Sequence, residues 1–222
     1  CIGMDGAVTP LLAESWIGSP DGKTYTFLLR KGVKFSDGKA FDGHTVKFSF
    51  DRARAEGSTN KAKKAVWDNV SSVAVDDAHT VVVVLHKPDY TLPFRLGENT
   101  AVILHPSTAA QAATDPIGTG PYKLDSWKKG SSVTLVKSDA FRDPARVKIR
   151  RATFRFINDP AAQVAALMAG DIDGMPRFGA FQSLAQFKGD KRFAVEMGST
   201  AGKGILTINN KRKPFDDVRV RR

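Results

Sequence analysis

The chain has 222 residues, of which 41% are hydrophobic, and its formal net charge is +11 at pH 7. This length suits one large domain or two small ones, and the hydrophobic fraction is sufficient for a buried core. No stretch approaches the roughly 18 apolar residues that cross a membrane, and a single cysteine, Cys1, excludes an internal disulfide.

The positive charge is spread along the chain, with acidic residues between the lysines and arginines. Its densest clusters, residues 142–155 and 211–222, interleave charged residues with Val, Ile or Phe. Such interleaving is typical of half-exposed strands, so we do not expect nucleic acid as a partner. A basic anion-binding or nucleic-acid-binding domain remains an alternative, because a net charge of this size favours association with anions.

The first elements are a strand and a helix. Residues 24–30 alternate and are rich in β-formers, which predicts a strand after the turn at residues 18–22. Asp42 is a suitable N-cap for a helix that runs through Ala53. A second, short helical segment is expected at residues 60–68.

A hairpin comes next. Residues 70–75 and 80–86 predict its two strands, with the turn at Asp76 and Asp77. Residues 81–85 form the most apolar strand of the chain, and we expect both of its faces to be covered.

The middle of the chain predicts several short elements. We expect a helical piece that leads to Gly97, a buried strand at residues 101–104 and a weak helix at residues 107–113. Alternation then predicts two further strands, at residues 132–137 and 149–157.

A well-marked helix follows these strands. Asp159 is its expected N-cap, Pro160 its first residue and Gly170 its C-terminal glycine. We expect residues 172–175 to return as a strand, so that strand, helix and strand form a right-handed crossover.

The last part of the chain predicts a linker and a strand. Residues 198–204 are rich in Gly and Ser, and residues 205–209 are expected to form a strand. Together the elements predict an α/β architecture with a mixed sheet.

A glycine corner at residues 117–122 stands out. Gly118, Thr119 and Gly120 are followed by Pro121, so the backbone there can approach another backbone or a ligand without a Cβ in the way. Two interpretations stay open: a turn that links two pieces of a sheet, or a corner that lines a ligand cleft. A phosphate loop is disfavoured, because such loops lead directly into a helix.

The sequence shows no catalytic or metal-binding constellation, and we expect neither a cofactor nor an enzymatic activity. No histidine pair has the HExxH spacing, and no serine has the GxSxG context. Asp171 and Asp173 are close in sequence, but they are more simply explained as two residues on one face of a strand. A secreted hydrolase remains a second alternative.

The corner resembles a signature of the extracytoplasmic solute-binding proteins that serve peptide and nickel ABC importers, known as family 5. Three other stretches agree with this family in order and spacing: residues 10–16 running on to 29–38, residues 165–173 and residues 214–221. Together they span nearly the whole chain.

The resemblance implies an α/β fold: a periplasmic-binding-protein-like type II lobe with a mixed sheet and an inserted β-rich subdomain. Residues 1–39 would form part of the first lobe, residues 40–113 the inserted subdomain and residues 114–204 the rest of that lobe. Residues 205–222 would start the crossover to a second lobe, with a helix that begins near residue 218. Relatives are longer, so the chain is expected to hold most of the first lobe without its opening segment.

The resemblance also implies a function. The protein would be the periplasmic, or otherwise extracytoplasmic and membrane-associated, substrate-binding component of an ABC importer. It would act as a monomer that captures a peptide or similar small solute by cleft closure and delivers it to the permease subunits.

Residues that face the ligand are implied by the same resemblance. Lys137 and Arg177 would pair with a ligand carboxylate, and Met175 or Phe178 would supply an apolar wall. For Lys137, a solvated strand end is an equal alternative. Nickel-binding members carry arginines at the positions of Lys137 and Asn99, so this chain departs from the pattern for a metal chelate. The full set of expected ligand-binding residues is Asn99, Thr100, Gly118, Thr119, Gly120, Lys137, Met175, Arg177 and Phe178.

Overall fold

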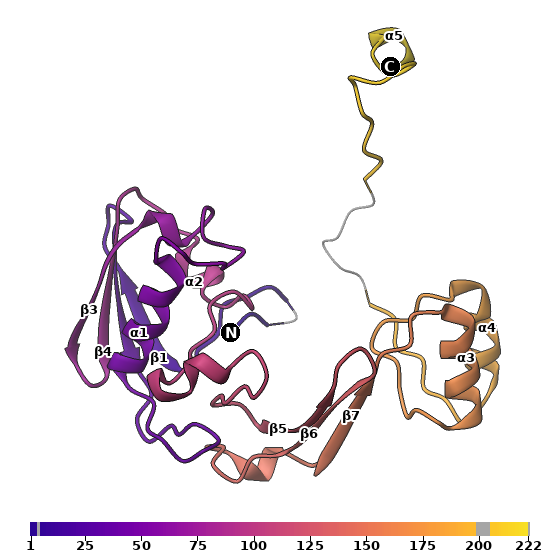
Figure 1. The fold of residues 1–222 in the computed structure, drawn as a ribbon, viewed down its shortest axis with the longest axis horizontal. Coiled ribbons are helices and arrows are strands. Elements are labelled where there is room, and N and C mark those ends of the chain that lie inside the picture. The colour runs from indigo at the N-terminus through magenta and orange to yellow at the C-terminus, as the bar shows by residue number, and fades with distance from the viewer. Residues whose placement is uncertain (4, 199–204, 222) are drawn as a thin grey trace. The chain divides into compact units, whose positions relative to one another are not determined.

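The computed structural model describes residues 1–3, 5–198 and 205–221. Contacts divide the chain into two compact units, unit 1 (Cys1–Phe156) and unit 2 (Ile157–Arg222). Figure 1 shows the strands and the longest helix gathered in unit 1.

Unit 1 is built on a four-stranded antiparallel sheet with strand order β1-β2-β4-β3 (Figure 1). Its strands are β1 (Ala13–Gly18), β2 (Thr24–Leu29), β3 (Val70–Asp77) and β4 (Thr80–Leu85). The predicted strand at residues 24–30 and the two predicted strands of the hairpin are confirmed. The predicted turn position is wrong, because Asp76 and Asp77 belong to β3 and the turn lies at residues 78–79. The sequence did not predict β1, whose register is interrupted by a bulge between Ala13 and Ser15.

Helix α1 (Gly43–Arg54) begins at the predicted cap. The Asp42 carboxylate accepts a hydrogen bond from the Thr45 backbone N–H at 2.9 Å, and the Thr45 hydroxyl oxygen accepts one from the Asp42 N–H at 3.1 Å. This reciprocal pair satisfies two backbone donors that the helix itself leaves unpaired. The helix packs on β3 and β4 and buries Val46, Phe50 and Ala53.

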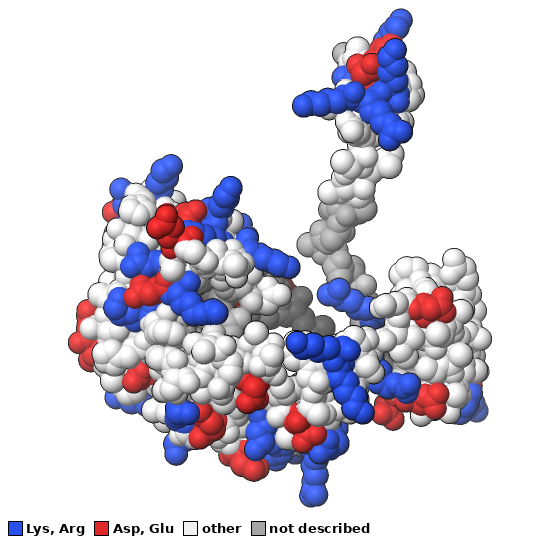
Figure 2. Space-filling view, viewed as in Figure 1, with Lys and Arg blue, Asp and Glu red and all other residues white. Residues whose placement is uncertain are grey.

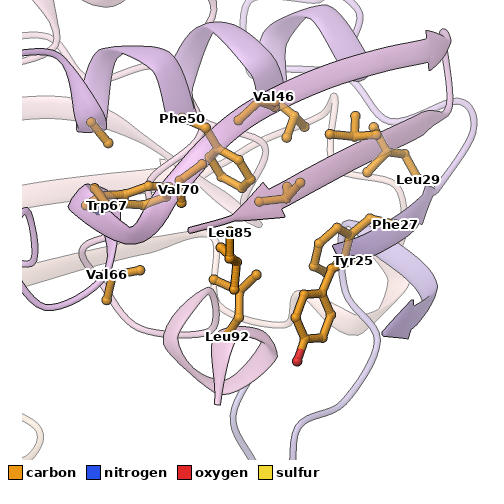
Figure 3. Packing of buried hydrophobic residues seen from close by; sticks show 14 of the residues in the cluster. Tyr25, Phe27, Leu29, Val46, Phe50, Val66, Trp67, Val70, Leu85 and Leu92 are labelled. Carbon is orange, nitrogen blue, oxygen red and sulfur yellow. The ribbon is translucent and has the colours of Figure 1, made fainter. Parts of the chain in front are cut away.

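The hydrophobic core of unit 1 lies between α1 and the sheet (Figure 3). Phe50 reaches from α1 to Trp67, with 5.0 Å between the ring centroids. Trp67 itself is 1% exposed, and Leu85 and Leu92 extend the same cluster. The alternation of apolar residues in β2 and β4 points one side of each strand into this core.

One face of β4 is less covered than the sequence predicted. Val81, Val83 and Leu85 are buried, whereas Val82 and Val84 are only half-buried. The expectation that both faces are covered is therefore wrong, because α1 packs on the side of Val81 and the other side keeps partial exposure to solvent.

Several short elements differ from the expectation. Residues 61–66 form turns before the 3₁₀ helix η1 (Trp67–Asn69). Their backbone bonds are irregular, since the Asp68 N–H bonds to the Lys63 carbonyl, five residues back, at 2.8 Å, and such a bond does not continue an α-helix. Residues 101–104 do not form a strand. There the Leu104 N–H bonds to the Ser49 hydroxyl at 2.8 Å and not to a neighbouring strand.

The remaining short helices of unit 1 are α2 and two 3₁₀ helices. Helix α2 (Leu92–Arg95) confirms the helical piece before Gly97. The weak helix expected at residues 107–113 is the 3₁₀ helix η2 (Pro106–Gln111), and η3 (Pro144–Arg146) follows later.

A second sheet of unit 1 has the order β5-β6-β7. Its strands are β5 (Tyr122–Lys128), β6 (Ser132–Lys137) and β7 (Arg151–Arg155), and both neighbouring pairs are antiparallel. The strands expected at residues 132–137 and 149–157 are thereby confirmed.

Unit 2 contains the predicted helix α3 (Pro160–Ala169). Asp159 accepts from the Ala162 N–H at 2.7 Å, and Gly170 ends the helix at a φ of 79°, a left-handed conformation that favours glycine. The other helices are η4 (Phe181–Ser183), α4 (Leu184–Gly189) and α5 (Val218–Arg221), of which α5 confirms the expected helix start.

Two strands predicted in unit 2 are not formed. Residues 172–175 and 205–209 have no strand assignment, so the predicted right-handed crossover is wrong. A strand needs a partner edge for its backbone groups, and no strand lies among the described residues of unit 2 to offer one. The linker expected at residues 198–204 lies outside the described residues except for Gly198.

The expected inserted subdomain, residues 40–113, does not form a sheet of its own. Its strands β3 and β4 continue the sheet of residues 13–29, because β4 pairs with β2. The domain boundaries expected at residues 113 and 204 stay predictions, and the observed division into compact units falls after Phe156.

Candidate ligand-binding site

A cavity of about 370 Å³ opens in unit 1. Its wall comes from β1, β2 and α1, from the segment before β1, from the loop after α2 and from the glycine corner. Most of the side chains on this wall are apolar. Those with the largest rings are Trp16, Phe27, Phe41 and Phe50.

The glycine corner forms part of the cavity wall. Gly118 and Thr119 line the cavity, whereas Gly120 does not. The Gly118 carbonyl accepts a hydrogen bond from the Ser36 N–H at 2.9 Å, which ties the corner to the turn before α1. A Cβ placed on Gly118 or Gly120 would meet no atom within 4 Å, so packing within the described chain does not explain either glycine.

The loop at Asn99 and Thr100 lies beside the cavity. Its neighbours Glu98 and Ala101 line the wall, but Asn99 and Thr100 themselves do not. The Thr100 carbonyl accepts from the Asn60 side-chain amide at 2.8 Å, and this bond holds the loop. The cavity wall therefore contains two residues of the predicted corner and the immediate neighbours of the predicted loop.

Lys137 lies apart from the cavity wall. It ends β6 opposite Tyr122, is half-buried, and its backbone N–H bonds to the Arg150 carbonyl at 2.9 Å. This position fits the predicted strand end, and a contact of its side chain with a ligand stays a prediction.

Met175, Arg177 and Phe178 belong to unit 2. The Phe178 ring meets Phe187 edge to face, with 5.4 Å between the centroids, and Phe187 meets Phe193 in the same way at 5.0 Å. Phe178 thus contributes to the small aromatic cluster of unit 2. The ligand roles of these three residues stay predictions.

Sequence reasoning missed most of the cavity wall. Trp16 belongs to the signature stretch at residues 10–16, which was the only signal that pointed toward it. Phe27, Phe41 and Phe50 have the spacing of ordinary core residues, and nothing in their local pattern distinguishes a side chain that faces a cavity.

Charged groups are scarce around the cavity. Glu98 carries the one acidic or basic side chain on the described wall, and its Oε1 lies 3.6 Å from Nη1 of Arg95.

Within residues 1–3, 5–198 and 205–221, no group of three or more potential ligands could hold a metal ion. In the same residues, every helix is too short or too polar to cross a bilayer.

Related structures define the class of fold. NikZ from Campylobacter jejuni, solved in complex with Ni(L-His), aligns with a TM-score of 0.80 and 27% identity over 97% of this chain and 44% of its own. DppA from Helicobacter pylori, solved with the peptide STSA, aligns with a TM-score of 0.68 and 26% identity over 82% of this chain and 40% of its own. The fold is α/β, of the type II periplasmic-binding-protein class.

The family follows from the sequence match. The model of the bacterial extracellular solute-binding proteins, family 5 Middle, matches residues 7–222, and the chain belongs to this family. The glutathione-binding protein GsiB of Shigella boydii serotype 4 is 30% identical over 225 residues, which cover 95% of this chain and 42% of that protein. The chain therefore spans less than half the length of this curated relative.

Proposed function

We propose that this chain is part of the substrate-binding component of an ABC importer, which captures a peptide or similar small solute and delivers it to a membrane permease. The observation that carries the proposal is the match to a solute-binding family over residues 7–222. The binding of glutathione, a peptide and a nickel complex by the three relatives supports a small polar solute. The protein would act outside the cytoplasm as a monomer.

Capture would depend on closure of a cleft between two lobes. A ligand that contacts both lobes binds the closed state better than the open one, so its affinity is shared between them. The proposed contacts that the first lobe contributes are Asn99, Thr100, Gly118, Thr119, Gly120, Lys137, Met175, Arg177 and Phe178.

Catalysis is not part of the proposed function. The family is one of solute-binding proteins, and the cavity wall is mostly apolar, with a single carboxylate paired to an arginine. Hydrolysis needs a nucleophile or activated water beside a base. A peptide solute should therefore leave the protein unchanged.

The experiment is a titration of the 222-residue chain with glutathione and with small peptides, followed by NMR and calorimetry. We expect weak binding, because much of the closed cleft lies outside this sequence in the proposed arrangement. Chemical shifts should change around Thr119, and the recovered peptide should be intact. Tight, stoichiometric capture by the chain alone would contradict the shared cleft, and cleavage of the peptide would contradict a purely binding role.

The charge of +11 leaves a nucleic-acid-binding domain as the second candidate. Acidic and basic side chains lie intermixed on the face of unit 1 that Figure 2 shows, which argues against one basic surface there. Retention on heparin tests the alternative. Elution at low salt supports the solute-binding role, whereas strong retention with a steep salt dependence would favour the alternative.

A further inference from the structure

We propose that the cavity of unit 1 holds an uncharged apolar side chain of the bound solute, such as that of leucine or phenylalanine in a small peptide. This inference rests on the proposed function and specifies the chemistry that the site selects. It is carried by the wall of the cavity, by its charge and by its position beside the predicted ligand contacts.

The wall provides an apolar surface that is already in place. Phe27, Phe41 and Phe50 are each less than 9% exposed, yet all three line the cavity, and half-buried Trp16 completes the aromatic part of the wall. These rings are fixed by the core of unit 1, so a ligand group would not have to order them. The volume of about 370 Å³ is within the usual range of small-molecule pockets, which have mostly apolar walls.

The charge of the wall selects against ionised ligand groups. Glu98 is the one charged side chain on the described wall, and Arg95 already lies 3.6 Å from its carboxylate. The α-amino group of Cys1, which also lines the cavity, already donates to the Thr9 carbonyl at 2.8 Å. A lysine or aspartate side chain inside the cavity would therefore lose its hydration and meet only charged groups that already have a partner, and this loss is costly. An aliphatic or aromatic side chain gains free energy by leaving water at the same place.

The cavity is continuous with the predicted contacts. Gly118 and Thr119 belong both to the cavity wall and to the predicted site, and Glu98 and Ala101 flank the loop at Asn99–Thr100. The space in front of Gly118 is open. A solute whose backbone lies along the corner therefore has one side chain at the mouth of the cavity.

The test compares dipeptides on the 222-residue chain by NMR. Ala-Ala, Leu-Leu and Lys-Lys are titrated to high concentration, and benzyl alcohol serves as a small apolar probe of the cavity. We expect Leu-Leu to bind about tenfold or more tightly than Ala-Ala, because additional carbon atoms leave water. Lys-Lys should bind no more tightly than Ala-Ala. Leu-Leu and benzyl alcohol should both shift the signals of Trp16 and Gly118.

Two variants that narrow the cavity make the assignment specific. Ala13→Leu and Ala101→Leu each add a larger side chain at the wall, and both should abolish the preference for Leu-Leu while weak binding of Ala-Ala persists. Gly57→Leu is the control, because Gly57 lies away from the cavity and a Cβ there meets nothing within 4 Å. It should bind like the parent chain. Melting curves identify any variant that does not fold. If one of the two narrowed variants does not fold, the other still tests the proposal.

The outcomes separate this inference from the proposed function. Dipeptide binding without a preference for Leu-Leu, or a preference that survives in both narrowed variants, would overturn the inference and leave the solute-binding role in place. Benzyl alcohol that enters the cavity while no dipeptide binds would overturn the assignment of the cavity to a peptide side chain. It would leave the solute-binding role in place, because that role shares the ligand contacts with a second lobe. Lys-Lys binding as tightly as Leu-Leu would contradict an apolar site.

Discussion

Asp51 on α1 lies between two cationic side chains. Its carboxylate accepts from Lys47 Nζ at 2.6 Å and from Arg54 Nε at 2.8 Å. Burial pushes the pKa of Asp51 upward, but the hydrogen bonds from Lys47 and Arg54 outweigh it and leave the pKa below its ordinary value. The ionised form is thus favoured by folding.

This shift predicts a pH dependence of stability. A lowered pKa in the folded state contributes stability that is complete above the unfolded value of 3.8 and is lost as the pH falls through the folded pKa. At pH 7, Asp51→Asn should lower the unfolding free energy by about 0.5 kcal/mol. The effect is small because the pair is partly exposed and the last turn of a helix disfavours a carboxylate. Urea unfolding of the parent chain and of Asp51→Asn measures this difference in free energy.

The difference between Asp51→Asn and the parent chain should shrink as the pH is lowered below 4. Asp76→Asn is the matched control, because Asp76 is exposed near the end of β3. It should change stability little at any pH. A difference that stays constant from pH 7 to pH 2.5 would show that the ion pairs are not its cause.

At the scale of the element, β4 offers a comparison of its two faces. Val83 is 1% exposed and belongs to the core, whereas Val82 is half-buried on the opposite face. Val83→Thr places a hydroxyl in the core and should cost about 1–3 kcal/mol of unfolding free energy. Val82→Thr makes the same chemical change on the face that is partly exposed to solvent, and we expect it to lower the unfolding free energy by less than about 1 kcal/mol. Equal losses in urea unfolding would contradict the observed orientation of the strand.

The elements that the sequence predicted correctly are those with local signals. Asp42 and Asp159 are caps that act within three residues, and Gly170 ends its helix through a φ that few other residues adopt. The elements that were wrong depend on distant partners. Residues 172–175 and 205–209 have the composition of strands, but a strand forms only beside another strand. The presence of that partner cannot be read from four or five residues of sequence.

The site shows the same limit. The corner at Gly118 was recognisable because Gly and Pro restrict the backbone in known ways. The aromatic wall formed by Phe27, Phe41 and Phe50 was not, since a ring that faces a cavity and a ring that fills a core have the same sequence pattern. The cavity exists only where several segments that are distant in the sequence meet, so it is a property of the tertiary structure.

At the scale of the whole molecule, the two units differ in how much apolar surface they bury. In unit 1 a continuous core joins α1, the first sheet and Trp67, whereas among the described residues of unit 2 only Ala180 and Phe187 are buried. Helix α3 buries none of its residues. Regions with few buried apolar contacts open at lower free energy than the core, and their amides exchange faster with solvent.

Native-state hydrogen exchange of the 222-residue chain should therefore show two levels of protection. Amides of β2, β4 and α1 should exchange only when the whole of unit 1 unfolds. Amides of α3 and α4 should exchange at least about a hundredfold faster, which corresponds to an opening free energy lower by about 2.7 kcal/mol. Leu92→Ala, at a residue 1% exposed in the core of unit 1, should speed exchange in β4 and leave α3 unchanged. Equal protection of α3 and β4, or a slower α3, would mean that unit 2 gains its stability from contacts other than its own buried side chains.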